Sequence, residues 1–337
     1  MHRLFKAMAS EKIDVPRPPT PRWNRSAKTL LHKALLQGCA VANKLWPGSA
    51  LLAGLAARTA LLLGDEHQAE MYGRRALQSL SASPRRLRRL SNMASRLSSK
   101  KARPDEIALT RSLADVQECL EAVGLTPFLV FGTLLGCIRE QRFIPGDTDI
   151  DLGVLGVSQI ESARDALSRS GRLKIIRCFY SNGVLTKVRS RHRNGCHIDL
   201  IAFSNDGPGV SWSSFNRKII LSRHYPGSIR PRRCTFQGLT VYVPEEAEDF
   251  LSWHYGDWRH PDAGYHWITS GPIRSQDQRA WARIGAPYAV LSSIIHNGLK
   301  KSLLMAQNAG DLFPEDELWR DIARALERAM ADQAQPR

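Results

Sequence analysis

Closely spaced cysteine pairs are missing from this chain of 337 residues. The chain has six cysteines, and none of them belongs to a Cys-x-x-Cys pair. They are Cys39, Cys119, Cys137, Cys178, Cys196 and Cys234. This spacing argues against a zinc site and against a disulfide framework, and it favours a reducing compartment.

Long apolar runs are also missing. The longest uncharged stretch around the most apolar part of the chain covers residues 45–57 and is interrupted by Trp46-Pro47. A bilayer span needs about 20 apolar residues, so this stretch is too short. Residues 1–10 lack the apolar core and small-residue cleavage site of a signal peptide. We therefore expect a soluble cytoplasmic protein, held at most peripherally at the inner membrane face.

Acidic residues are scarce in the first part of the chain. Residues 1–100 hold 18 Lys and Arg against 5 Asp and Glu, so they carry +13 of the total net charge of +16. The remaining residues are close to neutral, with a net charge of +3. The length suits two domains, and 43% hydrophobic content is enough for ordinary cores. We expect the near-neutral part to carry the chemistry.

The basic part shows a helical pattern. Residues 51–64 form one Ala- and Leu-rich segment, and a second helix is expected at about 67–80, before Pro84. Small, aromatic and terminating residues lie roughly where a tetratricopeptide (TPR-like) helix pair has them. They are Gly64, Ala69, Tyr72, Ala76, Leu77 and Pro84. The pattern fits one degenerate repeat or a plain helical hairpin, and either would serve for docking.

The most basic run is Arg85-Arg-Leu-Arg-Arg-Leu90, which continues to Lys100-Lys101. Three interpretations remain open for it: contact with the anionic membrane surface, contact with an acidic polymer, or a solvated helical linker. We expect a flexible segment at 1–24, a basic TPR-like region at 25–84 and a basic linker helix at 85–107. Nucleic acid is not the partner that we favour.

Three aspartates, Asp147, Asp149 and Asp151, occupy alternate positions in one short run. Because a strand turns its side chains alternately to opposite faces, these carboxylates should project from one face. Carboxylates that close repel one another unless a cation lies between them. Mg²⁺ prefers oxygen ligands and often shares them with substrate phosphates, so we expect Mg²⁺ here, with Mn²⁺ as the alternative.

Neighbouring segments add candidate site residues. Apolar residues 128–131 read as a buried strand, followed by Gly132-Thr133 and a helical pattern through Glu140. A strand–glycine–helix junction offers backbone N–H groups to a phosphate, and Thr133 would cap the helix or contact the phosphate. Asp199 lies in another strand-like run, 197–203, and would complete the metal site or help to accept a proton.

Each of these features has a structural alternative. The aspartate cluster alone is also typical of a Ca²⁺ loop or a solvated turn, and a Gly-Thr pair is typical of a turn. Asp199 would then be a cap or an ion-pair partner. Lys187 and Arg189 would neutralise donor phosphates or guard a solvated edge strand. His197, beside Asp199, would accept a proton or be structural.

Taken together, the motifs resemble the signature of the LicD and fukutin-related transferases over roughly residues 108–265. The matching residues are Gly132-Thr-Leu-Leu-Gly136, Arg139, Phe143-Ile-Pro145, Asp147-x-Asp-Ile-Asp151, His197-Ile-Asp199 and Val243-Pro-Glu245…Tyr255-Gly-Asp-Trp258…Pro261. Four ordered motifs are more specific than any one of them. The chain departs from the family at Gly146, where the family usually has Trp, and at Thr148, where it usually has an acid.

The resemblance implies an α+β protein, with a nucleotidyltransferase-like mixed sheet and flanking helices after an all-α region. It places the catalytic domain at 108–300 and a C-terminal helix, expected to pack on that domain, at 301–337. The implied reaction moves phosphocholine, phosphoribitol or a similar group from a CDP-linked donor to a glycan acceptor.

The resemblance also assigns roles to individual residues. Catalysis would fall to Asp149, Asp151 and Asp199, and these with Asp147 would hold the metal. Gly132, Thr133, Arg139 and Lys187 would bind the donor. Two rivals remain: a nucleotidyltransferase that leaves the nucleotide on its acceptor, and a non-catalytic TPR scaffold.

Overall fold

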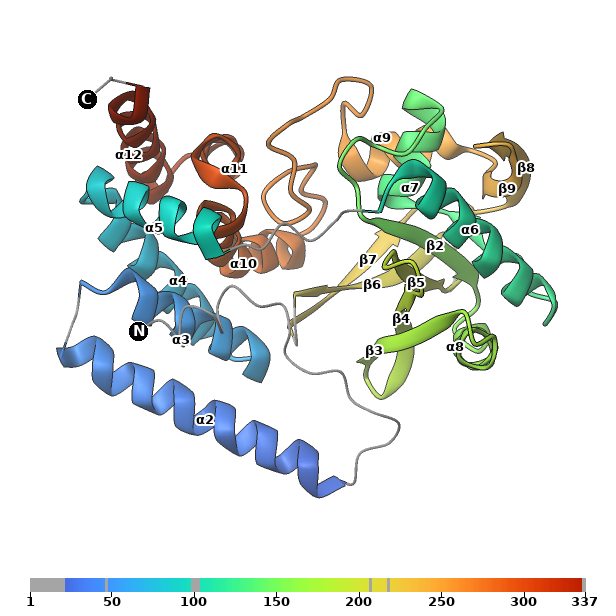
Figure 1. Cartoon of the computed structure of the whole chain (residues 1–337), viewed down its shortest axis with the longest axis horizontal. Helices are drawn as coiled ribbons and strands as arrows, with labels where there is room; N and C mark the ends of the chain where they lie inside the picture. Colours follow the sequence, from blue (N-terminus) through green and yellow to red (C-terminus); the bar gives the residue numbers. More distant parts are fainter. Residues whose placement is uncertain (1–21, 46–47, 98–103, 206–207, 217–218, 335–337) are drawn as a thin grey trace. The chain divides into compact units, whose positions relative to one another are not determined.

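The computed structural model describes residues 22–45, 48–97, 104–205, 208–216 and 219–334. The chain divides into two compact units (Figure 1). The helical unit comprises residues 1–101, 216–221 and 261–337. The sheet unit comprises residues 102–215 and 222–260.

A five-stranded mixed sheet forms the centre of the sheet unit, in the order β1-β2-β5-β4-β3. Strands β2 and β5 run parallel, and the other neighbours are antiparallel. The strands are β1 (Phe128–Leu129), β2 (Asp149–Leu155), β3 (Leu173–Ser181), β4 (Val184–His192) and β5 (His197–Phe203). The mixed sheet predicted from the sequence is confirmed, although β1 is only two residues long.

The sheet has an apolar face and a charged face. Residues at alternate positions of β2 and β5, such as Ile150 and Ile198, are fully buried. Helices α6 (Glu106–Glu121) and α8 (Gln159–Arg169) pack on this side of the sheet (Figure 1). Because strand side chains alternate, Asp149 and Asp151 project from the opposite face.

Shorter elements complete the sheet unit and its connections. Helix α7 (Phe131–Leu135) continues into η1 (Gly136–Glu140), as the helical pattern after Thr133 predicted. Two small sheets of two strands each and one helix follow. They are β6 (Val210–Asn216) with β7 (Ile219–Tyr225), β8 (Pro231–Phe236) with β9 (Leu239–Pro244), and α9 (Ala247–Tyr255).

A tight turn connects η1 to the acidic strand. The backbone N–H of Asp147 donates to the carbonyl of Ile144 at 3.0 Å, and Pro145 and Gly146 lie between them. Gly146 has a φ of +87°, which glycine adopts without steric cost. Pro followed by a left-handed glycine is the pattern of a type II turn. Gly146 therefore suits this turn, which needs a positive φ at that position.

The helical unit combines helices from both ends of the chain. Helix α3 ends at Gly64, whose φ is +79°, and the Asp65 side chain caps α4 by accepting from the Gln68 N–H at 3.0 Å. The predicted helix pair is thus present, whereas a TPR repeat is not confirmed. The helices are α2 (Arg22–Leu45), α3 (Ala50–Leu63), α4 (Glu66–Ser81), α5 (Pro84–Leu97), α10 (Gln276–His296), α11 (Gly298–Leu312) and α12 (Glu317–Ala334).

The C-terminal helix does not pack where the sequence suggested. Helix α12 contacts α4 and α5, and its residues Trp319, Ile322 and Leu326 join the core of the helical unit. An ion pair between Arg74 and Asp316 adds to this packing. The sheet unit accordingly ends at residue 260, not at the expected 300, because α10 also belongs to the helical core.

The basic run lies on α5. Leu87 and Leu90 are buried in the helical core, while Arg85 and Arg89 are exposed. The expected linker at 85–107 is therefore helix as far as Leu97, and residues 98–103 lie outside the described part of the chain, as does nearly all of the expected flexible segment at 1–24. None of the described helices has the length and apolar character needed to span a bilayer.

Candidate metal and phosphate site

The strand register brings the predicted acidic residues together. Asp151 lies directly opposite Asp199 on the neighbouring parallel strand, and Asp149 lies opposite His197. One carboxylate oxygen from each of Asp149, Asp151 and Asp199 falls within 4.8 Å of the others. Acids from two strands that are distant in the sequence thus form one cluster because β2 and β5 pair in this register.

Asp147 lies beside this cluster, at the end of the turn before β2. One of its carboxylate oxygens accepts the Thr148 N–H at 2.9 Å, and its side chain hydrogen-bonds that of Asp149. Gly132 borders the same place, since a Cβ built on it would lie 3.2 Å from Asp147 Oδ2 and 3.5 Å from Asp151 Oδ2. A larger residue at position 132 would therefore press on the carboxylates.

Asp199 is held between two cations from β4. Arg189 donates to both of its oxygens, through Nε and Nη2, at 2.6 Å each. The Lys187 ammonium lies 2.7 Å from Oδ2. Burial alone would raise the pKa of Asp199, but Lys187 and Arg189 outweigh it and hold that pKa well below its ordinary range. Asp199 therefore stays ionised and is a weak base.

Asp149 and Asp151 have the opposite electrostatic environment. Burial and the neighbouring carboxylates of Asp151 and Asp147 raise the pKa of Asp149 to about 9. Burial, together with Asp199, raises the pKa of Asp151 to about 7. Arg189 Nη2 lies 3.9 Å from Asp149 Oδ2, and Lys187 and Arg189 lower the pKa of Asp151, but burial and the neighbouring carboxylates outweigh these cations. Three converging carboxylates with excess negative charge fit a hard divalent cation such as Mg²⁺.

Thr133 has a structural contact in this arrangement. Its buried hydroxyl accepts the backbone N–H of Asp151 at 2.9 Å and so attaches α7 to the acidic strand. It does not cap α7, because Val130 occupies the N-cap position and makes no side-chain cap bond. Arg139 donates to the carbonyl of Trp258 at 3.0 Å and pairs with Glu140 at 2.6 Å. Its observed contacts fix the end of the sheet unit.

Strand β4 is an interior strand, so the expected alternative of a solvated edge strand for Lys187 and Arg189 is wrong. β4 pairs with β5 on one side and with β3 on the other. Both cations lie on the same face as the acidic cluster, since Arg189 is directly opposite Asp199. Phosphate groups of a ligand bound to a metal at the acidic cluster would therefore lie close to Lys187 and Arg189.

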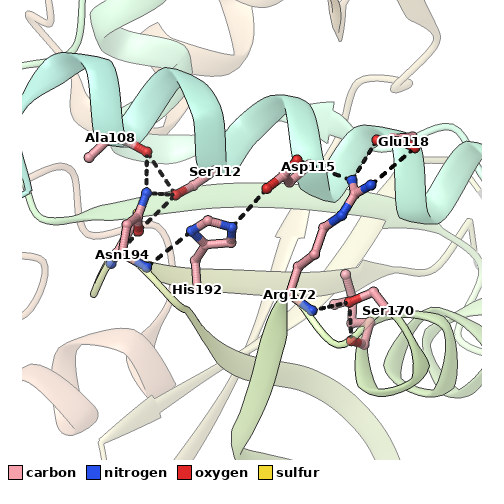
Figure 2. A network of polar contacts seen from close by, with 10 residues as sticks. Ala108, Ser112, Asp115, Glu118, Ser170, Arg172, His192 and Asn194 are labelled. Atoms are coloured by element: carbon pink, nitrogen blue, oxygen red, sulfur yellow. Dashed lines mark hydrogen bonds and ion pairs between the residues drawn. The ribbon is translucent and has the colours of Figure 1, made fainter.

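A polar network on the other side of the sheet escaped the sequence analysis. His192, at the end of β4, contacts Asp115 of α6 at 2.9 Å, and Arg172 contacts Asp115 and Glu118 at 3.1 Å and 2.5 Å (Figure 2). His192 and Asp115 are 77 positions apart. No spacing connects them, and each alone resembles an ordinary polar residue of a helix or strand.

Comparison with known proteins finds a family model and relatives that are similar to part of this chain. Residues 124–246 match the family model described as "LicD/FKTN/FKRP, nucleotidyltransferase domain". "Ribitol 5-phosphate transferase FKRP" from Mus musculus and from Homo sapiens are each 28% identical over 159 residues, which is 44% of this chain. The aligned part spans 31% of the length of each of these relatives.

Two solved structures are also similar. The lincosamide adenylyltransferase LnuA, bound to lincomycin, is 11% identical, with a TM-score of 0.32 over 52% of this chain and 94% of that chain. The antibiotic-resistance factor ANT(2'')-Ia is 10% identical, with a TM-score of 0.32 over 68% of this chain and 96% of that chain.

Proposed function

We propose that this chain, which carries a LicD/FKTN/FKRP nucleotidyltransferase domain, transfers a phospho-group from a CDP-activated donor to a hydroxyl of a surface glycan. Ribitol phosphate is the first group to test, because the matched relatives are named ribitol 5-phosphate transferases. Phosphocholine is the second. The observation that carries the proposal is the cluster of Asp149, Asp151 and Asp199 beside two cations of β4.

The cluster offers a site for a divalent metal. Asp149 and Asp151 would hold Mg²⁺, or Mn²⁺ in its place, with Asp147 beside them. Bound there, the metal would supply Lewis-acid stabilisation of charge on the transferring phosphoryl oxygens. The fit rests on the converging oxygen atoms and on the raised pKa values of Asp149 and Asp151.

The protein's own groups have separable tasks. Lys187 and Arg189 would bind the donor phosphates, because they present fixed positive charge on the same face as the acids. Asp199 would orient these two cations, and its low pKa makes it unsuited to accepting a proton. Gly132 leaves room for the phosphates next to Asp147 and Asp151. Thr133 and Arg139 would support this arrangement through their contacts with Asp151 and Trp258.

Product analysis with the purified full chain tests the reaction. CDP-ribitol, a glycan acceptor and Mg²⁺ should yield CMP and a phosphodiester-linked ribitol on the acceptor. The variant Asp149→Asn should lower kcat at least about 100-fold, since a ligand to the metal contributes several kcal/mol. Asp165→Asn, an acid of α8 paired with Arg164, is the matched control and should retain activity.

Other products would decide against the proposal. A nucleotide left on the acceptor, with release of ribitol phosphate from CDP-ribitol or of pyrophosphate from a nucleoside triphosphate, would identify a nucleotidyltransferase. Equal turnover by Asp149→Asn would remove the metal site from the mechanism. If no phosphorylated donor binds with Mg²⁺ in a thermal-shift assay, the scaffold interpretation would replace the enzyme.

We place the reaction in the cytoplasm, with peripheral contact to an anionic membrane surface as part of the proposal. All six cysteines are free thiols, which supports a reducing compartment. Exposed Arg85 and Arg89 of α5 support the membrane contact. Co-sedimentation with vesicles that contain phosphatidylserine, against neutral vesicles, tests it, with Arg85→Gln/Arg89→Gln as the variant.

A further inference from the structure

On the charged face of the sheet, the side chains are acidic on β2 and basic on β4 and β3. Asp151 lies opposite Asp199, and Asp199 lies opposite Arg189. A second row runs from Asp149 through His197 and Arg191 to Lys174. Paired residues of neighbouring strands share a face, so each row is acidic on β2 and basic on β4.

The basic end of the second row contains a repulsive pair. Lys174 of β3 is directly opposite Arg191 of β4, and both side chains are exposed. Arg193 follows in the connection to β5 and is also exposed. Among the described residues, no acidic side chain forms an ion pair with any of these three. Like charges directly across a strand pair destabilise a sheet, which points to an anion that would offset the repulsion.

A pocket of about 260 Å³ lies at this place. Its lining contains four Lys and Arg residues and one His, and no acidic residue. It consists of Gly171, Arg172, Leu173, Lys174, Arg191, His192, Arg193 and Gly195. The pocket therefore combines a concave shape with three cations that have no acidic partner in the described part of the chain, a combination that suits an oxyanion.

The polar network of Figure 2 fixes the walls of this pocket. Arg172 is held by Asp115 and Glu118 of α6, and His192 is held by Asp115. Asn194 donates to the carbonyl of Ala108 at 2.8 Å, which holds the loop between β4 and β5 against the same helix. The pocket is thus organised before a ligand arrives, and this reduces the entropic cost of binding.

The pocket is separate from the metal cluster. In the sheet, Arg191 lies two strand spacings from Asp149 and Lys174 lies three, or about 10 Å and about 14 Å. On β4, Lys187 and Arg189 pair with Asp199, and Arg191 follows Arg189 by two positions on the same face. A donor diphosphate engaged at the acids would use those two cations and leave Lys174, Arg191 and Arg193 for another molecule.

We propose that Lys174, Arg191 and Arg193 form a second oxyanion site that binds an acidic group of the acceptor glycan. The inference rests on the proposed function, because it assigns the second substrate of that reaction. The acceptor is then an acidic glycan, with a phosphate or a uronate carboxylate near the hydroxyl that reacts. The shared chemistry is a compact oxyanion bound by guanidinium and ammonium donors.

Calorimetric binding with the full chain, without donor or metal, tests the site. The probes are three tetrasaccharides of equal length, one with a phosphate, one with a glucuronate and one neutral. At least one acidic probe should bind about tenfold more tightly than the neutral one, and Arg191→Gln should remove about that factor. Comparing the two acidic probes identifies the group that the pocket prefers.

Matched variants separate charge from folding. Arg191→Lys keeps the charge and should retain most of the affinity for the acidic probe, which a merely structural role of Arg191 would not predict. Arg233→Gln alters an exposed arginine on β8 of the same unit and should leave binding unchanged. Circular dichroism and thermal melting confirm that each variant is folded.

Several results would overturn the inference. They are equal binding of acidic and neutral probes, equal binding by Arg191→Gln, full displacement of the acidic probe by CDP with Mg²⁺, and tighter Arg191-dependent binding of a single-stranded RNA. Failure of the proposed function looks different. In that case product analysis finds no transfer, while the acidic tetrasaccharide still binds in an Arg191-dependent way.

Discussion

Three aspartates of one cluster differ in what their ionisation costs. Asp149 and Asp151 have raised pKa values because burial and neighbouring carboxylates disfavour their charged forms. Asp199 has a lowered pKa because two cations favour its charged form. An ionised aspartate thus destabilises the metal-free protein where its neighbours are carboxylates, and stabilises it where its neighbours are the cations of β4.

The raised pKa of Asp149 predicts that the metal-free protein loses stability as pH rises. Between the ordinary value of 3.8 and about 9, the folded state keeps a proton on Asp149 that the unfolded state has released. The unfolded state therefore binds fewer protons, and the free energy of unfolding falls with pH across this window. Urea denaturation in EDTA from pH 5 to pH 9 should show this fall, and Asp149→Asn should flatten it.

The lowered pKa of Asp199 does not disturb that measurement. Its stabilising effect is present above the ordinary value of 3.8 and is lost only as pH falls below it, outside the range tested. An equal slope in Asp149→Asn and in the parent protein would show that the Asp149 carboxyl is ionised throughout. Excess Mg²⁺ should raise stability most at the alkaline end, where protons compete least.

Replacing Asp199 should destabilise the protein, in contrast to replacing Asp149. Asp199→Asn leaves Lys187 and Arg189 without their carboxylate, and Asp199 itself is only 3% exposed. Because both cations keep partial access to solvent, we expect a loss of about 1–3 kcal/mol at pH 8. Asp149→Asn should be neutral or stabilising there. Chemical denaturation of the two variants measures the difference, and equal losses would contradict it.

At the scale of elements, one hydrogen bond positions α7 against β2. Thr133→Val keeps the side-chain shape but leaves the Asp151 N–H without its acceptor. An unsatisfied buried N–H costs about 1–3 kcal/mol, and Asp151 would shift within the cluster. We expect this loss in denaturation experiments together with weaker Mg²⁺ binding by calorimetry. Thr133→Ser retains the hydroxyl and should restore both; failure of serine to do so would mean that the methyl group matters more.

Local sequence patterns predicted the individual helices and strands better than they predicted which of these elements pack together. The alternation of Asp149 and Asp151 correctly indicated a strand with its acids on one face, because side-chain alternation is a local property of a strand. Asp147, expected on the same strand, lies in the turn before β2. The Pro145-Gly146 turn and the α3–α4 pair are likewise local. The pairing of β2 with β5 brings Asp199 to the cluster. The strand-like run 197–203 made Asp199 a candidate, and the family resemblance supported it, but neither gave the register of the two strands.

Strand order explains what could not be predicted. Nothing in residues 184–192 says that β4 lies between β5 and β3, so Lys187 and Arg189 were equally consistent with an edge strand. The contact of His192 with Asp115 depends on α6 covering the apolar face of the sheet. These features arise from the packing of elements distant in sequence, for which periodicity carries no information.

At the scale of the whole molecule, helices from both ends of the chain share one core. The sequence of α12 indicates an amphipathic helix, but this pattern does not say whether its apolar face packs on a sheet or on other helices. In the structure it packs on α4 and α5. The pattern of a helix specifies that it has a partner and does not specify which one. The ion pair between Arg74 of α4 and Asp316, 242 positions apart, helps to hold the start of α12 against α4.

This pair gives a test of that arrangement. Asp316→Asn removes the carboxylate from Arg74, whose side chain is 25% exposed, and we expect a loss of about 1–2 kcal/mol. Glu315→Gln is the matched control, since the neighbouring Glu315–Arg279 pair is largely exposed and should contribute little to stability. Thermal and urea unfolding of the full chain at pH 7 provide the comparison.

Acidification distinguishes this ion pair from a general packing effect. The hydrogen bond from Arg74 holds the pKa of Asp316 below its ordinary value of 3.8. Its contribution is complete well above pH 3.8 and disappears as pH falls through the lowered folded pKa. The stability difference between the parent protein and Asp316→Asn should therefore shrink from pH 6 towards pH 3. A difference that stays constant with pH would mean that the asparagine side chain disturbs packing, and that α12 is not held by the charge on Asp316.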